Sequence, residues 1–526
     1  MKFLQNEKIK TIIVVCIFIT VWIWNVAFAA KYGEAYLDSD MASEMVLANK
    51  TNEAGVYLDT GWLYSTEIRI LGQIMLFKPL LLLFPNNWGL VRVVAQAIFL
   101  LATGLSYIYM TSILGNIRKS IFFAAILLCP FGFWHMWHGC FGGQYLIWIG
   151  FYSLLAGLIL RLSIRKGGHE WLQWPALVIL SFLCGLQSIR VFNNLLIPIV
   201  IAALIMTYSG LKETGGKVCF QKLRFLVIAV VSCLFAGTGY LINHFILQNI
   251  YAYANQDEKQ WQEFSISRVL SVFEDFIQLF GYPYNFTQTM EIPLFSLAGL
   301  LSCFGILLII VFIGGFVVSL RKYKILGNEE KTIVWTSIMA FFVPTMIFAF
   351  FLTSSNGSYF LPSFGLYVAT LQIAVDRFSY VYKKIGKVFL SAVILIITFL
   401  SGISTQMLFL KYPPRSHPEM VKVAEALKEQ GYTQAISIFW LGNVLTELSD
   451  GYIEVWVTTY DMNLDYMIPQ LQAKSHLTDK PQGKYAYVFE TYVFNNTESQ
   501  YSLLEDNDNA YLVYQDYLIT VVGIEE

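Results

Sequence analysis

The chain has 526 residues, of which 56% are hydrophobic, 16% aromatic and only 13% charged, and its formal net charge is -1. Soluble domains carry about a quarter charged residues, so this composition excludes an ordinary soluble enzyme. Apolar runs of roughly 20 residues, the length that a helix needs to cross a bilayer, recur between Ile12 and Leu410. The composition therefore indicates a polytopic integral membrane protein.

The hydrophobic pattern predicts eleven membrane-spanning helices. They are expected at residues 11–30, 90–112, 120–135, 144–160, 171–188, 193–209, 225–247, 293–319, 333–352, 359–375 and 388–410. The first run resembles a signal peptide in its basic start and small-residue end, but its apolar part is too long for one. We therefore treat it as the first span.

A further apolar stretch at residues 69–84 is interpreted through the distribution of charge. From Lys411 onward the sequence has 7 Lys and Arg against 17 Asp and Glu, which leaves 28 basic residues before that point. If the stretch does not cross the membrane, 20 of these 28 lie in loops on the cytoplasmic side, as the positive-inside rule requires. The stretch is therefore predicted to be an amphipathic helix at the outer interface, in which Arg69, Gln73 and Lys78 interrupt the apolar surface and Pro79 bends the helix.

This orientation places the N-terminus in the cytoplasm and the C-terminal region outside the cell. Four segments are then extracytoplasmic: residues 31–89, 134–144, 248–292 and 411–526. The last begins with an amphipathic helical pattern that ends at Gly431, and β-rich runs follow at residues 435–440, 452–460, 485–491 and 517–523. We expect an α-helical transmembrane domain at 1–410 and a small extracytoplasmic α/β domain at 411–526, whose acidity excludes nucleic acid as a partner.

Carboxylates follow the first span directly, in the segment YLDSDMASEMVLA. Asp38 and Asp40 precede a helical pattern, and Glu44 lies four residues after Asp40, on the same helix face. Carboxylates held close together can have altered proton affinity, so one of them can act as a general base on a hydroxyl group. The simpler alternative is that Asp40 caps the helix. An Asp-x-Asp pair can also bind a divalent cation.

The acidic motif, the interfacial helix after it and the eleven-span arrangement resemble the GT-C superfamily of membrane glycosyltransferases, which includes protein O-mannosyltransferases and aminoarabinose transferases. Members often have a motif D-E-A-x-Y-A-x-x-A in the first exterior loop. In DMASEMVLA, Asp40, Ala42 and Ala48 match this motif, whereas Met41 replaces Glu and Glu44 replaces Tyr. These departures leave open whether Asp38 or Asp40 is the catalytic residue.

The resemblance implies an inverting transfer, in which a carboxylate deprotonates an acceptor hydroxyl that attacks a sugar linked to a polyprenyl phosphate. Such a donor needs cations at the outer interface, and the candidates are Arg69, Lys78, Arg92 and Arg190. Arg92 and Arg190 lie at the outer ends of predicted spans, where a charge is costly and an Arg can bind phosphate bidentately. The alternative for both is snorkelling to the lipid headgroups.

Two histidines lie in the short connection WHMWHGCFGGQ at residues 134–144. His135 and His138 with Cys140 suggest metal ligands, but their spacing fits no known ligand set. An interfacial aromatic belt is the simpler interpretation, and aromatic side chains with His138 facing a sugar are the functional one.

Two other functions are compatible with this sequence. A transporter or lipid flippase would also have many spans, although neither paired repeats nor interrupted helices are evident. A non-catalytic protein would explain the altered acidic motif. For an enzyme, we expect a polyprenyl-phosphate sugar as donor and a cell-envelope acceptor, neither of which the sequence names.

Overall fold

The computed structural model describes residues 7–65, 68, 70–164, 169–213, 220–254, 261–263, 265–281, 295–351, 356–381, 384–412, 417–459, 466–496 and 509–525. The chain forms two compact units from separate stretches. We call them the helical unit (Met1–Ala27, Gln96–Ile242 and Asp257–Tyr412) and the sheet-bearing unit (Phe28–Ala95, Asn243–Gln256 and Pro413–Glu526). The division after Tyr412 lies close to the boundary predicted after residue 410, but the first long loop belongs to the same unit as the C-terminal region.

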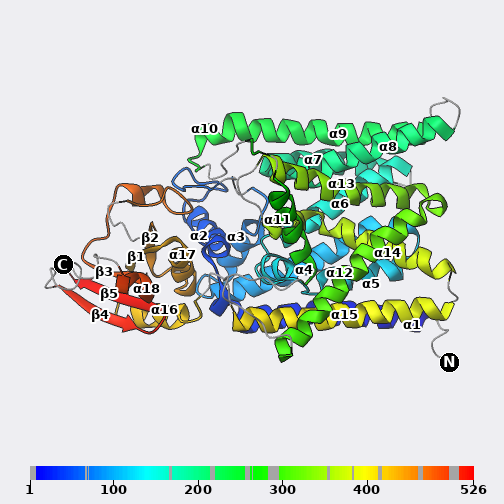
Figure 1. Cartoon of the computed structure of the whole chain (residues 1–526). Coiled ribbons are helices and arrows are strands. Elements are labelled where there is room, and N and C mark those ends of the chain that lie inside the picture. Colours follow the sequence, from blue (N-terminus) through cyan, green and yellow to red (C-terminus); the bar gives the residue numbers. More distant parts are fainter. Residues whose placement is uncertain are drawn as a thin grey trace. The chain divides into compact units, whose positions relative to one another are not determined.

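The helical unit consists of helices, most of them long and apolar (Figure 1). Some of these helices extend into the sheet-bearing unit. The α-helices of the helical unit are α1 (Glu7–Tyr32), α4 (Trp88–Thr111), α5 (Ile117–Leu128), α6 (Leu146–Ile164), α7 (Glu170–Gln187), α8 (Ile197–Glu213), α9 (Phe220–Ile242), α11 (Ile266–Ile277), α12 (Leu297–Arg321), α13 (Asn328–Phe350), α14 (Phe364–Val381) and α15 (Lys384–Lys411). Within the described residues, nine helices are long and apolar enough to cross a membrane. The protein is therefore a multi-pass membrane protein, as its sequence predicts.

Two of the eleven predicted spans do not correspond to a described helix that is long and apolar enough to cross a membrane. The span expected at 120–135 corresponds to α5, which has only 12 residues. Pro130 follows closely, and the residue before a proline is disfavoured in the helical conformation, which limits the helix. Next comes a buried π-helical segment, His135–Phe141, where an exposed connection was expected. The span expected at 171–188 corresponds to α7.

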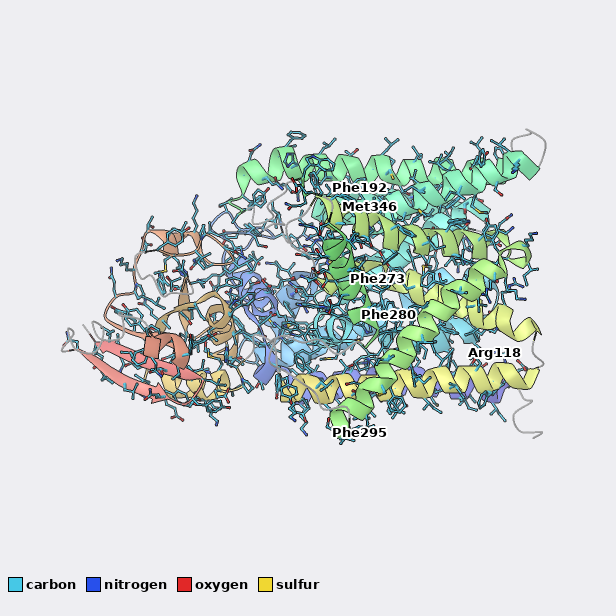
Figure 2. All side chains as sticks on the ribbon, in the orientation of Figure 1. Arg118, Phe192, Phe273, Phe280, Phe295 and Met346 are labelled. Carbon is cyan, nitrogen blue, oxygen red and sulfur yellow. The ribbon has the colours of Figure 1, made fainter. Side chains whose placement is uncertain are left out.

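Aromatic rings form the centre of the helical unit around α14. The apolar stretch that contains this helix is 94% buried, whereas the corresponding stretches of α1 and α12 are each 28% buried. Phe280 contacts Phe312 and Phe364, with ring centroids 4.4 and 5.6 Å apart. Figure 2 shows Phe280 among the helices and Phe295, which is 90% exposed, at their edge. Apolar side chains on the poorly buried helices suit contact with lipid.

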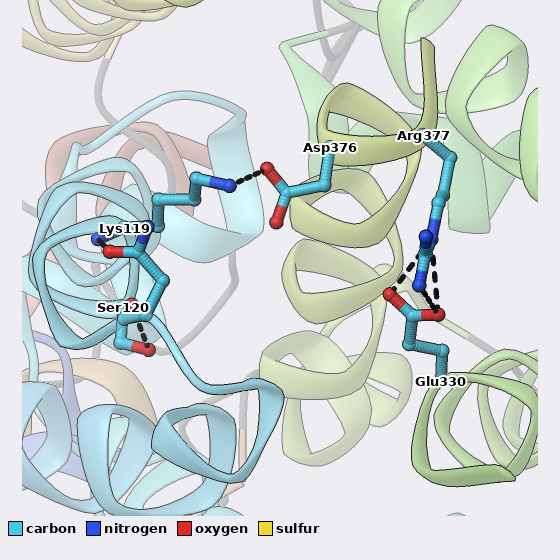
Figure 3. Close-up of polar contacts among 6 residues, drawn as sticks. Lys119, Ser120, Glu330, Asp376 and Arg377 are labelled. Atoms are coloured by element: carbon cyan, nitrogen blue, oxygen red, sulfur yellow. Dashed lines mark hydrogen bonds and ion pairs between the residues drawn. The ribbon is translucent and has the colours of Figure 1, made fainter. Parts of the chain in front are cut away.

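Ion pairs connect α5, α13 and α14 at one end of the helical unit (Figure 3). Lys119 of α5 pairs with Asp376 of α14. Arg377, the next residue, donates from Nε to both carboxylate oxygens of Glu330 on α13, at 3.1 Å each. Adjacent residues of α14 thus bind two neighbouring helices, which fixes its position between them.

The sheet-bearing unit combines a five-stranded sheet with short helices. Its elements are α2 (Ser39–Glu53), α3 (Ile74–Leu83), α10 (Gln248–Ile250), α16 (Met420–Glu429), β1 (Gln434–Ile438), α17 (Phe439–Leu448), β2 (Glu454–Thr458), β3 (Lys484–Glu490), α18 (Thr491–Asn496), β4 (Ala510–Gln515) and β5 (Ile519–Glu525). The four strands that the sequence indicates are β1, β2, β3 and β5, so the predicted α/β character is confirmed. The apolar stretch at 69–84 contains α3, a shorter helix with Pro79 inside it.

The strand order in this sheet is β2-β1-β3-β5-β4. β1 pairs in parallel with β2 and β3, and β5 pairs antiparallel with β3 and β4. Parallel neighbours need a crossover connection, and α17 supplies the one between β1 and β2. α17 and α3 both pack against α2. The acidic motif at the start of α2 is thereby held by elements from both ends of the chain.

Candidate functional site

Asp38 provides the cap at the start of α2. Its backbone is extended, its Oδ1 accepts a hydrogen bond from the Met41 backbone N–H at 2.8 Å, and it is 1% exposed. This bond satisfies one of the amide donors that the first turn of a helix leaves unpaired. The alternative that Asp40 is the cap is therefore wrong, because the helix begins at Ser39, two residues earlier than that alternative requires.

Glu44 holds the turn that leads into α3. Its Oε2 accepts a hydrogen bond from the backbone N–H of Gln73 at 2.7 Å, and its side chain is 2% exposed. A Cβ at Gly72 would lie 2.8 Å from the same oxygen, so a larger residue there would displace the carboxylate. Glu44 therefore supports the backbone of the site.

Asp40 has a different environment from the other two carboxylates. It lies in the first turn of α2 and is half-buried, whereas Asp38 and Glu44 are buried. The amino-terminal end of a helix favours a negative charge at this position. Of the three predicted catalytic residues, Asp40 is the one that is not fully buried.

A buried ion pair contacts the first turn of α2. Arg92 of α4, 5% exposed, donates from Nε and Nη2 to the two carboxylate oxygens of Glu447 on α17, at 2.5 and 2.6 Å. Its Nη2 also donates to the Met41 carbonyl oxygen at 3.1 Å, and the guanidinium lies over the Phe77 ring. Burial raises the pKa of the Glu447 carboxyl, and the positive charge of Arg92 opposes that rise. Arg92 thus joins α2, α3, α4 and α17, and its charge is already balanced.

Lys78, another predicted phosphate ligand of this unit, makes its hydrogen bonds to the segment that follows the acidic motif. The Lys78 Nζ donates to the Thr51 hydroxyl at 3.0 Å and to the Val56 carbonyl oxygen at 2.8 Å. These bonds connect α3 to the end of α2 and the loop after it. Arg69 lies outside the described residues.

Arg190 and His138 occur together in the helical unit. The Arg190 Nη1 donates to the Tyr145 hydroxyl at 2.6 Å, and its guanidinium lies 5.1 Å from the ring centroid of Tyr359. The His138 ring meets the same Tyr145 edge-on, at 5.7 Å, and stacks on Trp134 at 5.2 Å. The structure therefore joins two predicted site residues through Tyr145, which the sequence did not single out.

Metal binding was suggested by the Asp-x-Asp pair and by the residues around His138. Within the described part of the chain, no group of three or more His, Cys, Asp and Glu side chains could hold a metal ion. Asp38 is committed to the helix cap, and the His135 Nε2 lies 3.8 Å from the Cys140 Sγ inside a buried segment. A divalent cation requirement stays a prediction.

Comparison with known proteins gives a match at the level of fold. No protein-family model and no curated protein matches the chain by sequence. ArnT from Cupriavidus metallidurans bound to undecaprenyl phosphate is similar, with a TM-score of 0.56, 11% identity and 97% of each chain covered. Its apo state gives a TM-score of 0.54 at the same identity and coverage. An Archaeoglobus fulgidus oligosaccharyltransferase is similar with a TM-score of 0.43 and 12% identity, covering 87% of this chain and 64% of the other.

The chain has the fold of ArnT, and at 11% identity this likeness shows the fold alone. The likeness to ArnT extends over almost the whole of both chains, so it includes the sheet-bearing unit as well as the membrane helices.

Proposed function

We propose that this protein is an inverting glycosyltransferase that transfers a sugar from a polyprenyl-phosphate donor to an acceptor hydroxyl on the outer face of the cytoplasmic membrane. The observation that carries the proposal is that Asp40 is only half-buried, beside two acidic residues that are buried and hold the backbone. The GT-C fold, and a structural neighbour bound to undecaprenyl phosphate, support the donor class.

The proposed chemistry needs one base and a stabilised leaving group. The Asp40 carboxylate takes the proton of the acceptor hydroxyl, whose oxygen then forms a bond to the anomeric carbon of the donor sugar. The bond between that carbon and the phosphate oxygen breaks, and polyprenyl phosphate leaves with the electron pair. Attack opposite the leaving group inverts the anomeric configuration. A placed base typically contributes about 10² to 10⁴-fold to such a rate.

Arg190 is our candidate for the donor phosphate. Tyr145 and Tyr359 hold its guanidinium through a hydrogen bond and ring contacts, which limits the side-chain entropy lost on binding an anion. A guanidinium can donate two parallel hydrogen bonds to a phosphate. Arg92 was predicted for the same role, but its bidentate contact with Glu447 makes it a better candidate for positioning the acidic motif.

The test of the base uses paired variants in one motif. The purified protein would be incubated with a panel of polyprenyl-phosphate sugars, and released polyprenyl phosphate would be measured. Asp40→Asn should bind donor normally but lose about 10² to 10⁴-fold in turnover. Asp38→Asn is the matched control, since Asn caps helices about as well as Asp. A fully active Asp40→Asn with an inactive Asp38→Asn would move the base to Asp38, and full activity in both would remove the motif from the mechanism.

The test of the phosphate ligand is a binding measurement. Arg190→Ala should weaken donor binding about 10- to 150-fold, since a hydrogen bond to a charged group contributes about 1.5 to 3 kcal/mol. Arg161→Ala is the control, because Arg161 also lies over a tyrosine ring and donates to a hydroxyl, but on the predicted cytoplasmic side. Equal donor affinity in both variants would contradict the assignment of Arg190.

A further inference from the structure

A polar cavity lies within the sheet-bearing unit, and Asp40 is not part of its lining. Its volume is about 290 Å³. We call it the Glu454 cavity, and the residues of its lining that matter here are Lys50, Trp62, Thr433, Tyr452, Glu454 and His476. We propose that the Glu454 cavity binds an uncharged saccharide unit of the acceptor, an assignment to the acceptor that rests on the proposed transferase function.

The carboxylate of Glu454 is fixed from two sides. Its Oε1 accepts a hydrogen bond from the Lys50 Nζ at 2.9 Å and lies 3.2 Å from the His476 Nε2. His476 is 5% exposed, contacts Gln472 at 3.1 Å and stacks on Trp456, so its ring cannot turn freely. The other Glu454 oxygen, Oε2, has no partner among the described residues. Glu454 therefore presents a rigidly held acceptor at the cavity wall.

Hydrogen-bond donors lie in the same wall. Trp62 is 1% exposed, and its indole Nε1 has no hydrogen-bond partner among the described residues. A buried indole N–H usually has a partner, and leaving it without one is costly. The Tyr452 side chain is 46% exposed, and none of the described residues bonds to its hydroxyl. A ligand that offers acceptors and donors can bond to the Tyr452 hydroxyl, whereas the Trp62 Nε1 has almost no accessible surface and Trp62 contributes to the wall through its ring.

The balance of charge identifies the class of ligand. The lining has two carboxylates, Glu53 and Glu454, and the Lys50 ammonium pairs with Glu454, so the cavity offers no unbalanced positive charge to a phosphate. The Tyr452 and Thr433 hydroxyls add groups that both donate and accept. A volume of about 290 Å³ is near the lower limit of ligand pockets, which span roughly 300 to 1,000 Å³, and suits a small ligand. A saccharide, with many hydroxyls and no charge, fits all three properties.

The position of the cavity links it to the acceptor. Lys50 and Asp40 belong to the same helix, α2, and lie ten residues apart in sequence. At 1.5 Å per residue this separates them by about 15 Å along the helix axis. An acceptor glycan can therefore extend from a hydroxyl at Asp40 to a second saccharide unit in the Glu454 cavity. Such a subsite would select acceptors that are chains of sugars.

The proposal can be tested by ligand binding without any donor. The full-length protein in detergent would be titrated with mono- and disaccharides of glucose, galactose, mannose and N-acetylglucosamine, using saturation-transfer NMR and tryptophan fluorescence. Tyr452→Phe removes one accessible hydrogen-bonding group and should weaken binding about 3- to 10-fold. Thr433→Trp starts from an exposed position and should abolish binding by filling the cavity. Tyr466→Phe, which removes an exposed hydroxyl elsewhere in the unit, is the control.

The outcomes separate this proposal from the transferase proposal. Saturable binding that is weakened by Tyr452→Phe, abolished by Thr433→Trp and unchanged in Tyr466→Phe supports the saccharide subsite, whether or not turnover is found. No binding by any saccharide of the panel, or binding that all variants retain, overturns the subsite, even if polyprenyl phosphate is released normally. Binding of inorganic phosphate that Thr433→Trp abolishes would also overturn it, since the cavity would then select an anion.

Discussion

The Asp38 carboxylate begins α2 by accepting the Met41 amide, and the position of Asp40 depends on that start. Asp38→Ala removes the cap and should lower the free energy of unfolding by about 0.5 to 2 kcal/mol, whereas Asp38→Asn should leave it almost unchanged. Thermal denaturation of the purified protein measures both. Equal stability of the Ala and Asn variants would show that the cap contributes little.

The ion pair between Arg92 and Glu447 is strongly coupled, because both side chains are buried and make two hydrogen bonds. Removing one partner leaves an uncompensated charge, so Glu447→Leu should destabilise the protein by about 3 to 5 kcal/mol. Arg92→Met combined with Glu447→Leu should cost much less than the sum of the two single variants. A double-mutant cycle in denaturant provides the measurement, and additive effects would contradict the coupling.

Glu454 makes the stability of the protein depend on pH. The hydrogen bond from His476, followed by the contact with Lys50, lowers the pKa of Glu454 from 4.5 to about 2. A carboxyl whose pKa is lower in the folded state than in the unfolded state stabilises the folded protein at pH values above the unfolded pKa of about 4.5. This stabilisation is lost as the pH falls toward 2. Glu454→Gln should therefore be less stable than the parent at pH 7, with a difference that shrinks in acid. A difference independent of pH would contradict this linkage.

At the scale of single residues, the sequence identified candidate site side chains but not the residues that contact them. Asp38, Asp40 and Glu44 share a short motif, and helical spacing placed two of them on one face. Glu447 is 355 residues from Arg92, and no local pattern connects the two. Nothing in the sequence distinguishes Tyr145 from the other aromatic residues, and its hydrogen bond with Arg190 is seen only in the structure.

Close contact between glycines positions α12 in the helical unit. A Cβ at Gly305 would lie 2.1 Å from the backbone oxygen of Gly281, whereas nothing lies within 4 Å of the corresponding position at Gly314, in the same helix. Gly305→Ala must therefore separate two backbones and should lower the melting temperature strongly. Gly314→Ala is the control and should be neutral or slightly stabilising, because Ala favours helices over Gly. Similar effects of both substitutions would contradict the close contact.

Element type was predictable wherever periodicity was strong. Nine of the eleven spans predicted from apolar runs correspond to helices of spanning length among the described residues, and the β-rich runs correspond to β1, β2, β3 and β5. The sequence did not indicate β4, which pairs only with β5 in the strand order and has largely exposed side chains, so its composition carries little burial signal. The length of α5 was overestimated, because the apolar sequence continues beyond Leu128. Its continuation belongs to a separate buried segment, the π-helical residues His135–Phe141, and not to α5.

The orientation of the whole molecule is a prediction from its basic residues. Single cysteines at Asn87 and at Lys324, in a background without the seven native cysteines, should react with impermeant reagents from outside and inside respectively. Gly115 also lies in a predicted cytoplasmic loop, but its φ of +85° would strain a cysteine. Lys324 is therefore the better cytoplasmic site. Labelling of position 87 from the cytoplasm would contradict the proposed orientation.

The ion pair between Arg92 and Glu447 also sets an order of events during synthesis. A ribosome needs about 20 to 70 s to add the 355 residues that separate the two side chains. Throughout that interval the guanidinium lacks its carboxylate, so α2, α3 and the start of α4 cannot complete their packing. The first loop must therefore wait, unfinished and accessible to chaperones or proteases, until almost the whole protein has been translated.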